Sequence, residues 1–149
     1  MKLFTFKIEQ WFPRALEELF PFFADARNLE QLTPPWLHFR IVSPITAMSI
    51  GTTIRYRLRL HGIQLRWQSE ITAWEPPFRF VDTQVRGPYR QWIHEHTFEL
   101  RNGGTLMKDC VQYAVSGGAL VRKLFVAPDL KRIFDYRRAR LESLFGSAK

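Results

Sequence analysis

The sequence predicts an α+β fold in which one curved antiparallel sheet of about six to seven strands is covered on its inner face by helices. Two observations support this class. The central region, residues 38 to 115, reads as strands separated by turn signals, whereas helical spacing is confined to the segments on either side of it. The chain has 149 residues, of which 46% are hydrophobic, and this suits one domain spanning residues 1–149.

The first elements are predicted to be a strand and two short helices. Residues 3 to 11, LFTFKIEQW, are rich in aromatic side chains and stop before Pro13, which favours a strand. Pro13 at a helix start, followed by ALEELFPFF and then by DARNLEQL before a Pro-Pro pair, predicts the helices. We expect interruptions near Pro21 and Asp25, because proline disturbs the hydrogen-bond ladder of a helix.

The central region predicts a meander of strands, each with one buried face. Its turn signals include SP, GTT, HG, EPP, RGP and NGG. In GTTIRYRLRL, apolar side chains alternate with Arg55, Arg57 and Arg59, so the arginines face solvent. The next strand alternates in the same way. The inward-facing residues of these two strands are predicted to be Ile54, Tyr56, Leu58, Leu60, Ile63, Leu65, Trp67, Ser69 and Ile71.

A long amphipathic helix is predicted to end the fold. After Gly117 and Gly118, the segments ALVRKLFVA and PDLKRIFDYRRARLESLF carry helical spacing, and Pro128 suits either a kink or the first turn of a new helix. Arg137 falls on the apolar stripe, where it would neutralise an acidic ligand head or extend to a cavity rim. The apolar stripe consists of Leu130, Ile133, Phe134, Leu141, Leu144 and Phe145.

The stretch RQWIHEHTFE, residues 90 to 99, directs two histidines toward the apolar face of a strand. A tryptophan, the two histidines and a phenylalanine occupy every second position, so they share one face. The RNGG turn registers the next strand so that His96 lies opposite Asp109, and the RGPYR loop registers the previous one so that Asp82 lies opposite His94. A slip of two residues preserves this face, which carries Asp82, Gln84, Trp92, His94, His96, Asp109 and Tyr113.

Several interpretations of this cluster stay open. In one interpretation, the histidines and aspartates form a buried structural network; in another, they form the polar end of a ligand cavity. Tyr56 and Trp67 either line the same cavity or belong to the hydrophobic core. An imidazole oriented by a carboxylate also supports acid–base catalysis, with His94, His96 and Asp109 as candidates. The cluster His94-x-His96 with Asp109 resembles a metal donor set, but the aromatic surroundings favour an organic guest. We therefore predict no metal and no cofactor.

Four segments resemble the START-like, or SRPBCC, superfamily of polyketide cyclases, dehydrases and lipid-transfer domains. They are NLEQLTPPW, WQSEITAWEPPFRFVDTQVRGPYRQWIHEHTFE, GGTLMKDCVQY and the C-terminal helix. The resemblance implies a helix-grip fold, in which the sheet wraps the last helix around a cavity for an apolar or amphipathic small molecule. Binding or transport of such a molecule is our primary hypothesis. The alternatives are a cyclase, dehydratase or hydrolase, and an interaction module with a basic surface.

Net charge and composition restrict the partners. The charge is +8, but no groove-entering helix, zinc module or aromatic sheet surface accompanies it, so we expect no nucleic acid. A weak contact with an anionic membrane surface suits a carrier of apolar molecules. A single cysteine, Cys110, and the lack of a long apolar stretch predict a soluble cytoplasmic protein. The sequence leaves the oligomeric state open.

Overall fold

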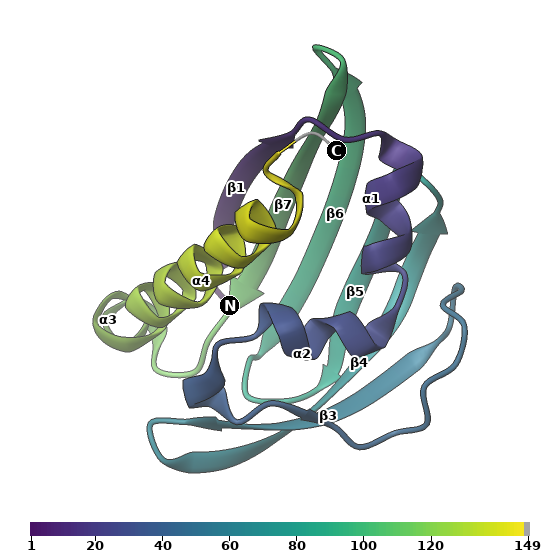
Figure 1. The fold of residues 1–149 in the computed structure, drawn as a ribbon. Helices are drawn as coiled ribbons and strands as arrows, with labels where there is room; N and C mark the ends of the chain where they lie inside the picture. The colour runs from purple at the N-terminus through teal and green to yellow at the C-terminus, as the bar shows by residue number, and fades with distance from the viewer. Residues whose placement is uncertain (148–149) are drawn as a thin grey trace.

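A computed structural model describes residues 1–147 and has the predicted order of elements (Figure 1). The strands are β1 (Phe4–Phe12), β2 (Arg40–Ile41), β3 (Thr53–Leu60), β4 (Ile63–Glu75), β5 (Arg79–Arg86), β6 (Gln91–Arg101) and β7 (Gly104–Ala114). The helices are α1 (Leu16–Phe23), α2 (Leu29–Leu32), α3 (Gly118–Val121) and α4 (Ala127–Phe145). Short 3-10 turns η1 (Ala26–Asn28) and η2 (Pro35–Leu37) and a π-helical segment η3 (Arg122–Val126) join them.

The strands form a seven-stranded antiparallel sheet in the order β1-β7-β6-β5-β4-β3-β2. The N-terminal strand β1 pairs with β7, which closes the meander on one side, and the other edge is the two-residue strand β2. Figure 1 shows α1, α2 and α4 on the same, concave face of the curved sheet. This is the helix-grip arrangement that the resemblance implies.

The first helical region differs from the prediction at its prolines. The helix α1 begins at Leu16 rather than at Pro13, and it contains Pro21 without interruption. Pro21 has no backbone N–H, so the Glu17 carbonyl lacks its usual helical partner. Both residues lie on the exposed side of α1, where that carbonyl is accessible to solvent. The predicted break at Asp25 is confirmed, because its carboxylate accepts a hydrogen bond from the Arg27 backbone N–H and caps η1.

The predicted strand registers around the histidines are confirmed. His96 lies opposite Asp109 in the β6–β7 pair, and Asp82 lies opposite His94 in the β5–β6 pair. In β4 the alternation of faces holds up to Ile71, after which a register shift between β4 and β5 strengthens the local bend of the sheet. One predicted inward residue of β4, Ile63, is exposed because it lies at the tip of the β3–β4 hairpin.

The C-terminal helical segment runs without a break from α3 through η3 into α4. Pro128 lies in the first turn of α4, so the second of the two possibilities at this proline, a helix start, is the one observed, and the π-helical turn that directly precedes it was not predicted. Its buried stripe comprises Leu130, Phe134, Leu141 and the charged Arg137. Among residues 1–147, no helix is both long and apolar enough to cross a membrane.

Two clusters of buried hydrophobic side chains lie between the sheet and the helices. The α1 cluster consists of Phe12, Leu16, Leu19, Phe20, Phe23, Leu32, Ile71, Phe80, Phe98, Met107 and Leu141. The tryptophan cluster consists of Trp67, Trp92, Val111, Tyr113, Leu130 and Phe134. The His96 ring stacks on Phe80 of the α1 cluster, whereas the His94 ring meets Phe134 of the tryptophan cluster edge-on. The two histidines therefore lie at the junction of the two clusters.

Candidate ligand-binding site

A cavity of about 200 Å³ lies between the concave face of the sheet, the segment from α1 to η2, and α4. Most of its lining is apolar. Its polar side chains come mainly from β3, β4, β5, β6 and α4, and they include Tyr56, Ser69, Asp82, His94, His96 and Arg137. Drug-sized ligands occupy sites of roughly 300–1,000 Å³, but a dry cavity of about 150 Å³ already binds benzene. The space therefore suits a guest of one or two rings, or one end of a longer molecule.

The histidines and aspartates form one compact network. His94 Nε2 lies 2.8 Å from Asp109 Oδ1, and His96 Nε2 lies 2.7 Å from Asp82 Oδ2. These bonds run diagonally, because each histidine bonds the aspartate that lies opposite the other histidine in the strand pairing. The remaining ring nitrogens approach the same two oxygens, at 3.8 Å for His94 Nδ1 and 3.2 Å for His96 Nδ1, although neither forms an aligned hydrogen bond.

Aromatic stacking holds the two imidazoles in place. Their ring centroids are 3.7 Å apart with an interplanar angle of 26°, and Phe80 stacks on the far side of His96 at 4.0 Å. Residues two apart on a strand point to the same face, so the HEH sequence creates this stack directly. Both histidines are less than one-tenth exposed, and their orientation is fixed by packing on one side and by carboxylates at their edges.

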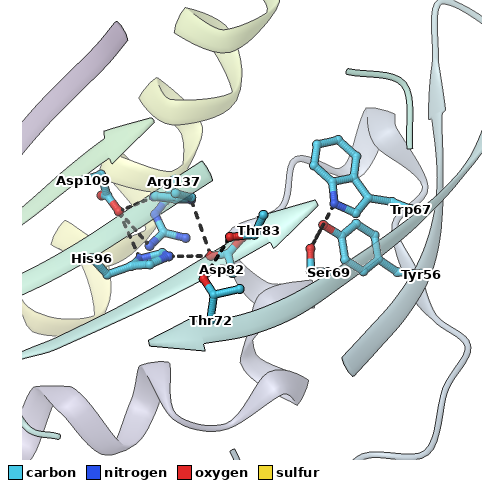
Figure 2. A network of polar contacts seen from close by, with 10 residues as sticks. Tyr56, Trp67, Ser69, Thr72, Asp82, Thr83, His96, Asp109 and Arg137 are labelled. Atoms are coloured by element: carbon cyan, nitrogen blue, oxygen red, sulfur yellow. Dashed lines mark hydrogen bonds and ion pairs between the residues drawn. The ribbon is translucent and has the colours of Figure 1, made fainter. Parts of the chain in front are cut away.

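Arg137 reaches this network from α4 (Figure 2). Its Nη2 lies 3.6 Å from Asp109 Oδ1, and its guanidinium carbon lies 5.5 Å from the centroid of the Phe23 ring. Within the described part of the chain, the buried nitrogens Nε and Nη2 of Arg137 have no hydrogen-bond partner. Buried charged donors are normally satisfied, so Arg137 retains capacity for an additional acceptor. Sequence reasoning identified this residue from its position on the apolar stripe.

The surroundings separate the protonation states of the two histidines. Burial and repulsion from His96 lower the pKa of His94, despite its bond to Asp109. Burial also opposes protonation of His96, but the contacts with Asp109 and Asp82 outweigh it and raise the pKa of His96 above its ordinary value. At neutral pH, His94 is therefore the neutral member of the pair, and His96 is the one that carries a proton more readily.

The aspartates stay ionised despite their burial. Burial favours the neutral acid, but the charge of Arg137, the hydrogen bond from His94 and the close approach of His96 hold the pKa of Asp109 well below its usual range. For Asp82, the hydrogen bond from His96 and the neighbouring charges likewise outweigh burial and lower the pKa. Ionised carboxylates only accept, so the bonded ring nitrogens must be the donors. With His96 protonated, two carboxylates balance two cations and the network has no net charge.

A second polar group faces the cavity further along the sheet. The Trp67 indole N–H donates to Ser69 Oγ over 3.0 Å, and the Tyr56 hydroxyl lies 3.4 Å from the same oxygen (Figure 2). Burial and the charge of Asp82 raise the pKa of Tyr56, which keeps its phenol protonated. Sequence reasoning included Tyr56 and Trp67 but passed over Ser69 as too common a residue type. Its inward position on the strand was the one available signal.

Three predicted ligand-binding residues lie outside the cavity lining. Asp109 lies behind the histidines, between β7 and α4. The Gln84 amide bonds both the N–H and the carbonyl of Tyr89, so it shapes the β5–β6 loop that bears this lining residue. Tyr113 is buried in the tryptophan cluster, with its hydroxyl 3.3 Å from Arg122 Nε. Trp92, in contrast, does line the cavity.

The geometry around the histidines argues against the metal interpretation. Ligand atoms of Asp82, His94 and His96 lie within 4.8 Å of one another, so the donor set contains Asp82 rather than the Asp109 suggested by the sequence. A metal ion lies near each imidazole plane, roughly 2.0–2.1 Å from its nitrogen. Two rings stacked 3.7 Å apart cannot both direct in-plane lone pairs at one such ion. The absence of a metal stays a prediction that this stacking favours.

Known protein structures share the fold at low sequence identity. Protein CV1439 from Chromobacterium violaceum superposes with a TM-score of 0.76 at 12% identity, covering 97% of this chain and 98% of that one. Protein Ms6760 from Mycobacterium smegmatis gives 0.69 at 19% identity, with coverages of 94% and 89%. Ginseng major latex-like protein 151 from Panax ginseng gives 0.71 at 9% identity, with coverages of 96% and 97%.

The fold and its cavity define a START-like domain. Residues 12–141 match the family described as "Polyketide cyclase / dehydrase and lipid transport". The chain therefore belongs to this family, within the SRPBCC superfamily. No curated protein matches the chain in a sequence search.

Proposed function

We propose that the protein binds, and in a carrier role transports, a small and largely apolar molecule that bears an uncharged polar group. The apolar body occupies the cavity, and the polar group contacts the network of Asp82, His94, His96 and Arg137. Family membership supports an SRPBCC domain for hydrophobic ligands. The proposal adds the charge state of the guest and the residues that recognise it.

The observation that carries this proposal is a hydrogen-bonded network beside an otherwise apolar cavity, in which Arg137 and the histidines face two carboxylates whose pKa values are lowered. A charged guest would bring an uncompensated charge into a buried site, which is unfavourable. A hydroxyl group can donate to the Asp82 carboxylate and accept from Arg137, and a carbonyl group can accept from Arg137, without changing the net charge. Asp82 suits this role because its side chain keeps 22% exposure and borders the cavity.

Three guests of nearly equal size test the proposal: naphthalene, 2-naphthol and 2-naphthoate. Their binding to the purified protein is measured by isothermal titration calorimetry and by the shift in melting temperature. We expect 2-naphthol to bind most tightly and 2-naphthoate most weakly. Tightest binding of the carboxylate would contradict the charge argument, and binding of none of the three would contradict the cavity as the site.

A matched pair of variants locates the guest. Leu58→Trp introduces a large ring at the cavity lining, and Leu100→Trp introduces the same ring at an exposed position on β6. We expect the first variant to abolish 2-naphthol binding and the second to leave it unchanged, with both proteins folded by circular dichroism. Equal binding by both variants would exclude this cavity.

One observation supports acid–base catalysis as a second candidate function. The hydrogen-bonded Asp82 and His96 both border the cavity, and the raised pKa of His96 favours the protonated form that a proton donor needs. A cyclase or dehydratase would use such a donor, whereas Asp109 would orient the imidazoles from behind. Once a reactive guest is known, His96→Gln should abolish its turnover while preserving its binding. Unchanged turnover would contradict a catalytic role for His96 and leave ligand binding as its proposed role.

A further inference from the structure

Five exposed apolar side chains lie at one end of the molecule. Ile63 at the tip of the β3–β4 hairpin is 63% exposed, and Trp36 in η2 is 44% exposed. Leu120, Leu124 and Phe125 of α3 and η3 are 67%, 57% and 55% exposed. We call these five residues the apolar rim. Single exposed hydrophobic residues are ordinary, but a group contributed by three separate segments, namely η2, the β3–β4 hairpin and the continuous α3–η3 helix, marks an interaction surface.

Contacts between the elements show that the rim is one surface. The His61 ring, two residues before Ile63, lies 6.5 Å from the Phe125 ring, and His61 Nε2 lies 2.8 Å from Asp129 Oδ2. On the other side of the helix, Trp36 packs against Tyr136 and under the guanidinium of Arg132. Figure 1 shows η2, α3 and the β3–β4 hairpin at the same end of the fold.

The cavity reaches the surface beside this rim. Its lining includes the half-buried Leu60 and Leu65 at the end of the hairpin, and the exposed Pro88 in the β5–β6 loop. Away from the rim, the lining includes the buried Ile71 and Phe80 and the half-buried Asp25 and Met48, so Pro88 beside the rim is the exposed lining residue. An opening at this end would bring a guest past the apolar rim.

Basic residues flank the rim. Arg59 and Arg66 project from the outer face of the hairpin, and Lys123 projects from η3 between the exposed apolar residues. Among residues 1–147, no carboxylate forms a salt bridge with these three cations, and Arg132 is engaged by an aromatic ring rather than by an acid. This charge is in keeping with the net charge of +8.

We propose that this end of the protein docks on an anionic lipid membrane, with the apolar rim inserted at the interface and the cations among the headgroups. Tryptophan and aliphatic side chains ringed by lysine and arginine have the composition of an interfacial anchor. The inference rests on the proposed function for its purpose, since an apolar guest would then pass directly between bilayer and cavity. The docking surface itself is defined by the exposed residues and is tested without a guest.

Vesicle co-sedimentation tests the docking surface. The protein is mixed with vesicles of pure phosphatidylcholine or of an equimolar phosphatidylcholine–phosphatidylglycerol mixture, at low and at high salt. We expect binding to the mixed vesicles that weakens with salt. Lys123→Glu should weaken it by about tenfold or more, since one cation near such a surface contributes roughly fivefold and its reversal counts twice. Leu124→Ser with Phe125→Ser should abolish binding.

Control variants separate this surface from the rest of the molecule. Leu100→Ser removes an even more exposed leucine, 71% against 57% for Leu124, from the end of β6, and Lys7→Glu reverses an exposed charge on β1. Both should bind vesicles as the unaltered protein does. The proposal is overturned if the protein does not bind mixed vesicles, if the controls lose binding equally, or if Leu124→Ser with Phe125→Ser instead converts a dimer to a monomer in sedimentation velocity.

The guest experiment distinguishes failure of docking from failure of the proposed function. The Leu124→Ser, Phe125→Ser variant should bind 2-naphthol as tightly as the unaltered protein when no vesicles are present. Vesicle binding without any naphthol binding would support the membrane-docking surface and contradict the proposed guest binding. Naphthol binding without vesicle binding would support guest binding and contradict the docking surface.

Discussion

His96 donates to Asp82 over 2.7 Å, although the residue opposite Asp82 in the strand pairing is His94. The reciprocal diagonal bond joins His94 to Asp109, so each aspartate oxygen contacts both stacked imidazoles. This arrangement couples β5, β6 and β7 on the concave face, and Arg137 attaches it to α4. Loss of one member therefore alters the charge experienced by all the others.

The first prediction concerns the pH dependence of stability. The raised pKa of His96 means that its contribution to the unfolding free energy is fully present below its unfolded pKa, near 6.5, and is lost as pH rises through the folded pKa. The lowered pKa of His94 has the opposite sign, so stability falls as pH drops below 6.5. We expect urea unfolding across about pH 5 to about pH 9 to give a maximum near 6.5, with limbs of at most about 1.4 kcal/mol per pH unit for each group.

Two variants assign the limbs of that curve. His96→Gln should flatten the alkaline limb, and His94→Gln should flatten the acid limb, while the absolute stability of both variants falls. The slopes are compared rather than the absolute values. Flattening of the same limb by both substitutions would show that the two histidines do not differ in the way their surroundings dictate.

Alternation of side chains along the strands allowed much of the site to be predicted from sequence. His94 and His96 share the inward face because they are two residues apart on one strand, and the turns on either side register Asp82 and Asp109 onto the same face. The diagonal bonding was not predictable, since it depends on side-chain rotamers and on the ring stack. Ser69 carried no compositional signal, and its role became visible only through its contact with the Trp67 indole.

The helices were predicted in order and in approximate extent, but their irregular turns were not. The π-helical turn before Pro128 depends on how the ring of that proline meets the preceding carbonyls, which spacing alone does not determine. The exposed hydrophobic residues of α3 and η3 also escaped notice. They follow helical spacing like a core stripe, and only the structure shows that nothing among residues 1–147 covers them.

The second prediction is that Asp109→Asn is strongly destabilising. Asp109 is 1% exposed and interacts with both histidines and with Arg137, so its neutralisation leaves buried positive charge uncompensated. Removing one partner of a buried ionic network costs about 3–5 kcal/mol. Urea unfolding measures the loss. The matched control is Asp135→Asn, which breaks an exposed pair with Lys131 and should change the stability by less than about 1 kcal/mol. Equal losses would contradict the network.

The third prediction concerns Arg137 and acid resistance. The charge of Arg137 is the chief influence that lowers the pKa of Asp109, so Arg137→Met should raise that pKa. Because the stability contributed by a carboxylate with a lowered pKa is lost as pH falls through the folded pKa, acid unfolding should begin at a higher pH in this variant. Near-ultraviolet circular dichroism follows the transition. Arg140→Met on the same helix is the control. An unchanged acid midpoint in Arg137→Met would show that the charge of Arg137 does not stabilise the ionised form of Asp109.

The fourth prediction distinguishes the second polar group from the first. Ser69→Ala leaves the buried indole N–H of Trp67 without its acceptor, and an unsatisfied buried donor costs about 1–3 kcal/mol. Urea unfolding should show this loss, whereas Ser116→Ala at an exposed turn should stay within about 0.5 kcal/mol of the unaltered protein.

If the hydroxyl of 2-naphthol binds at the histidine network, its affinity should change by less than threefold in Ser69→Ala but fall by about tenfold in Asp82→Asn, the value of one lost hydrogen bond. A larger fall in Ser69→Ala than in Asp82→Asn would move the polar end of the guest to the group of Tyr56, Trp67 and Ser69.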